Sequence, residues 1–435
     1  MAPPRLTREL GLPAATALVV GQVIAVGIFL TPGTIVRVLA SPLLVLLLWA
    51  AMGGMAICGA LCYGALAARY PQAGGGYVYL REAYGPRLAF MYGWKCLLVM
   101  DPGITAALAT GFAAYVAYLV PMGPAATRAV AVGAIAGFAA IHVAGVRLGV
   151  RVLTVVSVLK ILLVLGLTGL AFASPAASSA HFTPFVERAA GAPPLVGAIA
   201  GAFVAAFFSF GGWWEVTKVA GEVREPSRTL PRALVLGLAI VTAAYAAATM
   251  AFLAVVPIAR VAEGQAVVAQ VGEAILGSGG GSVVAVIVIV CVLGSLGAMQ
   301  MVAPRLYIAM AADGLFPAAA AAIHPWFGTP ARAIILQAAL ASLLVVLGTF
   351  DTIVAYFVFV TVVFIAATVA GVFVLRRREG DFTVPGHPWT PAVFLALVAA
   401  LLVLLGASNP VQALLGAAVV GAAVPVYRVL RARSR

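Results

Sequence analysis

The stretch GQVIAVGIF, residues 21–29, places two glycines in an apolar segment, and TPG follows it at 31–33. A second apolar segment is interrupted in the same way by the glycine pair in FFSFGGWW, residues 207–214. Glycine is a poor helix former, and backbone within a bilayer must be hydrogen-bonded internally or line a cavity. Each stretch therefore predicts a helix that is broken near its middle.

The composition is that of a membrane protein. The 435 residues are 64% hydrophobic and only 9% charged, which excludes a soluble domain of this size. A membrane helix needs about 20 predominantly apolar residues. Twelve such segments are predicted, at 12–36, 42–68, 86–120, 127–146, 151–173, 194–217, 232–256, 282–311, 331–349, 352–375, 389–407 and 410–430. We therefore expect an all-α integral membrane protein with one transmembrane domain over residues 1–435, and no cleaved signal peptide.

The apolar segments form two groups of five and a terminal pair. The approximate repeats are 12–173 and 194–375, the second inverted relative to the first, and the terminal helices lie at 389–430. The two broken helices are then the first and the sixth. Such a matched pair of glycine-interrupted spans indicates the binding site of a secondary transporter.

The distribution of Lys and Arg predicts the orientation. With the N-terminus inside, all but six of the 26 basic residues fall on the cytoplasmic side. The outer loops hold Arg37, Arg128, Arg188 and Arg260, and the apolar segments hold Lys95 and Lys160. Cytoplasmic loops carry the excess of basic residues. We therefore expect a multi-pass protein of the cell (inner) membrane with both termini cytoplasmic. The net charge of +13 reflects this topology and gives no support to a nucleic-acid partner.

The remaining residue pattern argues against an enzyme and a channel. The cysteines Cys58, Cys62, Cys96 and Cys291 fall in apolar segments and the four histidines are scattered, so we expect no disulfide, no metal site and no cofactor. The sequence shows no glycine-rich phosphate loop and no nucleophile elbow. A channel would need a ring of polar pore-lining residues, and the sequence shows none. A secondary transporter is the class that the pattern favours.

Broken helices suit the binding of an amino acid, which carries an ammonium and a carboxylate. The start of a second half-helix offers free N–H groups at the positive end of the helix dipole, here at Val26 and Gly27. The carbonyls near Val23, Phe208 and Gly211 could accept from the ammonium. The alternative interpretation is that these glycines only allow helices to pack closely.

Several motifs resemble those of one family. IAVGIFLTP at 24–32 resembles the first-helix motif of the amino acid–polyamine–organocation (APC) superfamily, and VAGEVREP at 219–226 with RTLPRAL at 228–234 resembles its stretch after the sixth helix. Its eighth-to-ninth connection is similar to PRLY at 304–307, DGLFP at 313–317, His324-Pro325 and Thr329-Pro330. LRRR at 375–378 and PVY at 425–427 favour the bacterial branch similar to L-type amino acid transporters (LAT).

The resemblance implies a LeuT-like fold and a secondary active transporter of amino acids that works by alternating access. We expect sodium-independent exchange of neutral L-amino acids; proton-coupled symport and transport of cationic amino acids or polyamines are the alternatives. The implied substrate-binding residues are Val23, Ile24, Ala25, Val26, Gly27, Met100, Ile104, Phe208, Ser209, Phe210, Gly211 and Trp214. Phe208 is placed like the family's aromatic lid, and the bulk of Trp214 indicates small neutral substrates.

The first-helix signature departs from the family's pattern. It usually reads Gly-Ser-Gly or Gly-Ala-Gly, whereas here it reads Ala25-Val26-Gly27. One glycine and a side-chain hydroxyl for the substrate carboxylate are lost, while the backbone N–H groups remain. We therefore expect a stiffer break that still binds amino acids.

Lys160 lies well inside the fifth apolar segment, where a lysine costs on the order of 2.5–3.5 kcal/mol on insertion scales and is a functional candidate by default. In the family that this chain resembles, a lysine here occupies the volume of the sodium ion of sodium-coupled relatives. We expect its ammonium to tie the broken first helix to the fifth by donating to free carbonyls. The alternatives are a lysine that snorkels to the interface and a merely structural cation. Desolvation would favour the neutral form of the lysine, and loss and gain of its proton would then allow proton coupling.

Other charges near the apolar segments have a less definite role. Asp101 either selects cationic side chains or relays protons, or else forms a structural ion pair or caps freed N–H groups. Glu215 and Lys218, three residues apart, are expected to form a helix-surface pair. They continue through Glu222 into a cytoplasmic network that locks the inward gate.

The resemblance also bears on partners beyond the amino acid substrate and the lipid bilayer. Animal L-type exchangers join a glycoprotein subunit through a disulfide in the loop after the third helix. Here that loop, residues 121–127, has no cysteine. We therefore expect no covalently linked heavy subunit.

Overall fold

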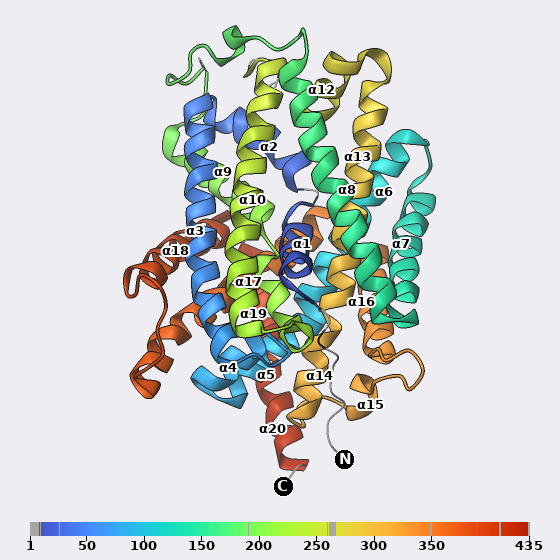
Figure 1. Ribbon diagram of the computed structural model, residues 1–435, viewed down its shortest axis with the longest axis vertical. Helices are drawn as coiled ribbons and strands as arrows, with labels where there is room; N and C mark the ends of the chain where they lie inside the picture. The colour runs from blue at the N-terminus through green and yellow to red at the C-terminus, as the bar shows by residue number, and fades with distance from the viewer. Residues whose placement is uncertain are drawn as a thin grey trace.

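The computed structural model describes residues 8, 10–25, 27–189, 191–258, 260, 267–348, 350–408 and 410–433. These residues form helices joined by short connections, and the pairing of Leu10 with Val223 is an isolated bridge. Most of the long helices run along the long axis of the molecule (Figure 1). The predicted all-α fold is therefore confirmed over the described residues.

The first part of the chain forms eight α-helices and one π-helical turn. They are α1 (Leu12–Val23), α2 (Gly27–Leu39), α3 (Pro42–Arg69), α4 (Gly76–Tyr84), α5 (Pro86–Lys95), the π-helix η1 (Cys96–Met100), α6 (Asp101–Leu119), α7 (Pro124–Ala144) and α8 (Val146–Ala173). Prolines stand at the first position of α3, α5 and α7, where their missing N–H costs no intrahelical bond. A 3₁₀ turn, η2 (Ser179–Phe182), then leads to the second part.

The second part continues with α9 (Leu195–Phe210), the 3₁₀ helix η3 (Trp213–Glu222), α10 (Pro226–Val255), α12 (Val267–Leu276), η4 (Gly277–Gly279), α13 (Gly280–Val302), α14 (Pro304–Ala312), α15 (Ala318–Ala321), α16 (Ala331–Leu347) and α17 (Phe350–Glu379). The last helices are α18 (Trp389–Ser408), α19 (Pro410–Gly421) and α20 (Ala423–Arg433). In the described part of the chain, ten helical runs are long and apolar enough to cross a membrane. Two further predicted segments, 12–36 and 331–349, hold shorter apolar helices, so the count of twelve spans stays a prediction.

Both predicted breaks are present. α1 ends at Val23, Ile24 has an extended backbone, and α2 begins at Gly27. α9 ends at Phe210, and Gly212 has a φ of 101°, a left-handed conformation that favours glycine. The chain continues from Gly212 as the tighter 3₁₀ helix η3. Two helical runs are therefore interrupted where the sequence pattern places the glycines.

Close contacts between helices hold the two breaks together in the core. α2 packs against α9, α1 against α10, and α3 against α10. Gly53 of α3 permits the last contact, because a Cβ there would lie 2.4 Å from the side chain of Thr242. Outward faces are apolar, as a lipid environment requires: Val155 and Leu162 of α8 are 66% and 61% exposed.

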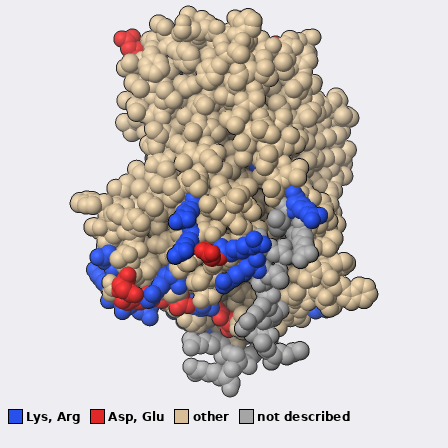
Figure 2. Space-filling view, viewed as in Figure 1, with Lys and Arg blue, Asp and Glu red and all other residues tan. Residues whose placement is uncertain are grey.

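Charged side chains gather toward one end of the molecule. Figure 2 shows Lys, Arg, Asp and Glu in the lower part of this face, while the upper part is nearly free of them. In Figure 1 the same lower end holds α4, α5, α14 and α20. Arg69 pairs with Glu379 at 3.0 Å, and Arg81 pairs with Asp313 at 2.7 Å. The molecule is therefore electrically polarised along its long axis.

Candidate functional site

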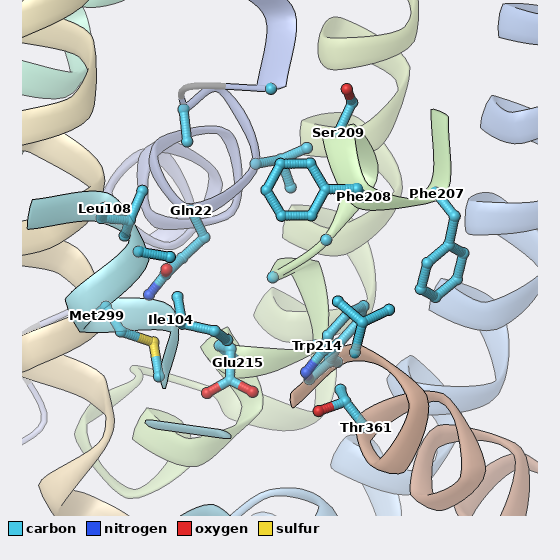
Figure 3. A pocket seen from close by; sticks show the side chains of 17 residues that line it. Gln22, Ile104, Leu108, Phe207, Phe208, Ser209, Trp214, Glu215, Met299 and Thr361 are labelled. Carbon is cyan, nitrogen blue, oxygen red and sulfur yellow. The ribbon is translucent and has the colours of Figure 1, made fainter. Parts of the chain in front are cut away.

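A cavity lies between the two breaks (Figure 3). Its wall is formed by Gln22, Val23, Ala25, Gly27, Ile104, Ala107, Leu108, Phe207, Phe208, Ser209, Gly211, Gly212, Trp214, Glu215, Met299, Val358 and Thr361. Most of these residues come from α1, α6, α9, η3 and α17. The cavity is largely apolar, with a few polar groups, which is the composition of small-molecule sites.

The predicted substrate residues divide into those that line the cavity and those that do not. Val23, Ala25, Gly27, Ile104, Phe208, Ser209, Gly211 and Trp214 line it. Phe210 instead packs against the rings of Trp49 and Tyr245, and Met100 is buried against Lys95. Ile24 is buried and is not part of the wall. Val26 lies outside the described residues.

A hydroxyl pair joins the start of α2 to the end of α9. Thr31 Oγ1 lies 2.5 Å from Ser209 Oγ, and Thr31 also bonds the carbonyl of Gly27 at 2.9 Å. A Cβ on Gly27 would lie 2.8 Å from Ser209 Cα, so only glycine permits this approach. The close-packing interpretation of Gly27 therefore has direct geometric support, and it is compatible with N–H groups that face the cavity.

Tyr245 of α10 connects the carbonyls of both breaks, a contact that the sequence did not reveal. Its hydroxyl lies 2.8 Å from Val23 O and 3.0 Å from Ser209 O, and the ring is fully buried. The carbonyl of Phe208 also has a donor, the N–H of Gly211 at 3.2 Å. The carbonyl of Phe208 therefore already accepts a hydrogen bond, and the carbonyl of Val23 shares the single Tyr245 proton with that of Ser209.

The ammonium of Lys160 lies within a ring of oxygen atoms at the first break. Lys160 Nζ donates to Ile24 O at 2.6 Å and to Gly21 O at 2.7 Å, and Ser295 Oγ is 2.9 Å away. Ser295 Oγ lies 2.8 Å from Gly21 O and 3.0 Å from Ile24 O, so it reinforces the same contacts. Lys160 is fully buried and does not snorkel to an interface. It joins α8 to the end of α1.

The expectation of a surface pair at Glu215 and Lys218 is wrong. Both side chains are at most 1% exposed, and Lys218 Nζ lies 2.6 Å from Glu215 Oε2 and 2.9 Å from Asp101 Oδ1. The pairing itself is present, because the 3₁₀ geometry of η3 places side chains at i and i+3 on one face. That face is buried instead of exposed because Asp101 of α6 lies against it, and Tyr307 Oη lies 3.2 Å from the second oxygen of Asp101.

Lys95 and the ion pair of Glu222 with Arg305 are further buried charges in this part of the molecule. Lys95 Nζ contacts Met100 Sδ at 2.8 Å and lies 4.8 Å from the centre of the Tyr92 ring, a cation–π contact. At the end of η3, the buried Glu222 pairs with Arg305 at 2.8 Å. The role of Glu222 in an inward gate stays a prediction.

The comparisons with known proteins agree with this geometry. The amino acid permease family model matches residues 10–424. The serine/threonine exchanger SteT of Bacillus subtilis is 28% identical over 90% of this chain and 89% of its own. The b(0,+)-type amino acid transporter 1 of Mus musculus is 30% identical over 87% and 78%, and the human large neutral amino acids transporter small subunit 2 is 28% identical over 97% and 80%.

These matches define a class of membrane transporter. The chain belongs to the amino acid permease family, within the APC superfamily and similar to its LAT-type members. It is a multi-pass transporter of amino acids and not an enzyme, as the sequence predicted.

Proposed function

We propose that the protein exchanges neutral L-amino acids across the cell membrane by alternating access and without sodium. The observation that carries this proposal is the position of Lys160, whose ammonium donates to two carbonyls of the first break. Backbone carbonyls are the ligands that a sodium ion would use in a broken transport helix. A fixed positive charge among them replaces the ion. The relative named as an exchanger, SteT, supports the choice of exchange over symport.

The amino acid backbone would bind at the two breaks. Its carboxylate would accept from the N–H groups at the start of α2, at Gly27, where the helix dipole is positive. Its ammonium would donate to carbonyls at the ends of α1 and α9, including the second lone pair of Val23 O. Phe208, which lines the cavity beside Gly211, would close over the bound amino acid.

The same proposal includes the membrane topology. Twelve spans would comprise the inverted repeats 12–173 and 194–375 and the terminal helices 389–430. The end that carries the ion pairs of Arg69 and Arg81 would face the cytoplasm, together with both termini, because basic residues collect on that side. Cysteine accessibility to an impermeant reagent at engineered loop positions tests this orientation.

We also expect the protein to act without a disulfide-linked subunit. The four cysteines are free in the structure, and three of them are buried within helices. Exchange by the purified chain alone is the expected result. A strict requirement for a second protein would overturn this part of the proposal.

Transport by purified protein in proteoliposomes tests the function. Uptake of labelled neutral amino acids is measured without sodium into vesicles that are empty, preloaded with unlabelled amino acids, or under an inward proton gradient. Uptake that depends on internal amino acid supports exchange. Uptake into empty vesicles that follows the proton gradient replaces exchange with proton symport, and a requirement for sodium contradicts the assignment of Lys160.

A further inference from the structure

Three buried polar side chains on the wall of the cavity carry atoms with unused hydrogen-bonding capacity among the described residues. Gln22 Nε2 and Thr361 Oγ1 have none among the described residues, and the Glu215 carboxylate has only its ion pair with Lys218. Gln22, Glu215 and Thr361 are 7%, 0% and 3% exposed, so water at the protein surface does not serve them. A buried polar group without a partner is destabilising, because it has given up its hydrogen bonds to water.

Buried polar groups without hydrogen-bond partners are rare in folded proteins, and several at one cavity indicate a bound ligand or water. Here they come from three elements that are distant in the sequence, α1, η3 and α17, and they border one cavity. In Figure 3 the ends of Gln22, Glu215 and Thr361 all lie below Phe208, on the side away from Ser209. They therefore lie on the other side of Phe208 from the hydroxyl of Ser209.

The donor and acceptor types of the three groups define what they could bind. An ionised carboxylate only accepts hydrogen bonds, an amide NH₂ only donates, and a hydroxyl does both. A substrate hydroxyl or carboxamide offers both a donor and an acceptor, and could therefore pair with members of this set. An aliphatic side chain offers neither and would leave Gln22 Nε2 and Thr361 Oγ1 unpaired.

The charges around Glu215 argue against a cationic substrate side chain. Lys218 already lies 2.6 Å from its carboxylate and also neutralises Asp101 at 2.9 Å. The ammonium of Lys95 is buried against Met100 and interacts electrostatically with Glu215, Lys218 and Asp101. A further ammonium would therefore enter a region that already holds two buried cations for two carboxylates.

We propose that Gln22, Glu215 and Thr361 form a subsite that selects amino acids with a short, uncharged polar side chain ending in a hydroxyl or carboxamide. The proposal rests on the proposed transport of amino acids and names their class. Trp214 and Ile104, which line the same cavity, limit the length of the side chain. Lys218 is a positioning residue that holds the Glu215 carboxylate in place.

The sharpest test compares threonine with valine, which have nearly the same shape and differ by a hydroxyl. Each competes for exchange of labelled serine in proteoliposomes, alongside asparagine, leucine, lysine and arginine. A site built to bind a hydroxyl rejects the analogue that lacks it far more strongly than a merely apolar pocket does. We expect threonine to compete at least about tenfold better than valine, and asparagine to compete better than leucine or lysine.

Two substitutions test whether the proposed subsite causes the preference for threonine over valine. Thr361→Val and Glu215→Gln each keep the side-chain shape, and each is expected to reduce the threonine-to-valine ratio severalfold. The matched control is Thr368→Val in the same helix, because the Thr368 hydroxyl bonds the Phe364 carbonyl of its own helix at 2.8 Å. Its ratio is expected to stay at the wild-type value.

The outcomes separate this proposal from the proposed function. Exchange in which valine and threonine compete equally, or in which lysine or arginine competes best, overturns the subsite and leaves amino acid exchange intact. Exchange of none of the amino acids tested overturns the function itself. Because the wild-type ratio is informative alone, the test stands even if a variant does not fold.

Discussion

Replacing Lys160 by methionine tests whether the buried ammonium holds the first break in shape. Methionine keeps a long flexible side chain but has no N–H donor. The carbonyls of Gly21 and Ile24 then lose donors at 2.7 and 2.6 Å. Ser295 Oγ lies near both oxygens, but its single proton serves one of them at a time. One buried carbonyl is therefore left without a partner.

The expected loss of exchange rate follows from this one unpaired carbonyl oxygen. A buried acceptor without a donor costs about 1–3 kcal/mol, and each 1.4 kcal/mol corresponds to a factor of ten. If the cost falls on the binding-competent form of the break, exchange slows by roughly 5- to 150-fold. The double variant Lys160→Met/Ser295→Ala leaves both carbonyls unpaired and is expected to be slower still.

The assay is the initial rate of exchange in proteoliposomes, normalised to the amount of folded protein recovered in a single size-exclusion peak. Thr168→Val is the control in the same helix, since the Thr168 hydroxyl bonds the Val164 carbonyl one turn away in its own helix, at 2.7 Å. Its rate is expected to stay near that of the wild type. A Lys160→Met protein that exchanges at the wild-type rate would refute the reasoning and leave Lys160 a structural residue.

Three further variants probe the breaks and the buried charges. Gly27→Val places a Cβ about 2.8 Å from Ser209 Cα and should abolish exchange while the protein still inserts, and normal exchange would contradict the site assignment. Tyr245→Phe removes the hydroxyl shared by the carbonyls of Val23 and Ser209 and should lower both exchange and the unfolding temperature; unchanged values would show that the hydroxyl is dispensable. Lys218→Met leaves two buried carboxylates without their cation, at a cost of about 3–5 kcal/mol, and folded protein should be scarce unless both partners are also changed to amides.

The sequence predicted the breaks because their cause is local. Glycines at 27 and 212 stand where the backbone must leave the helix, and the second of them adopts a φ of 101°. Apolar segments likewise depend on composition alone, and each predicted segment holds a helix in the structure. Lys160 was identifiable for the same reason, since a charge within an apolar segment is conspicuous without any knowledge of its neighbours.

The contacts at the breaks could not be predicted because they join residues far apart in the chain. Tyr245 reaches carbonyls that lie 222 and 36 residues before it, and nothing in its apolar surroundings indicates those partners. Gln22 and Thr361 are polar residues within apolar segments. That pattern was a usable signal for a polar subsite, although it does not say that the two side chains border the same cavity.

The error at Glu215 and Lys218 has a structural cause on the helix that follows the second break. The spacing of three residues places the two side chains on one face, both in an α-helix and in the 3₁₀ helix that follows the left-handed Gly212. That face is buried because Lys218 also pairs with Asp101 of α6, which lies 117 residues away in the chain. The same break that opens the cavity therefore also brings a carboxylate to its wall. A movement of η3 during transport would move the binding groups and the buried ion pairs together.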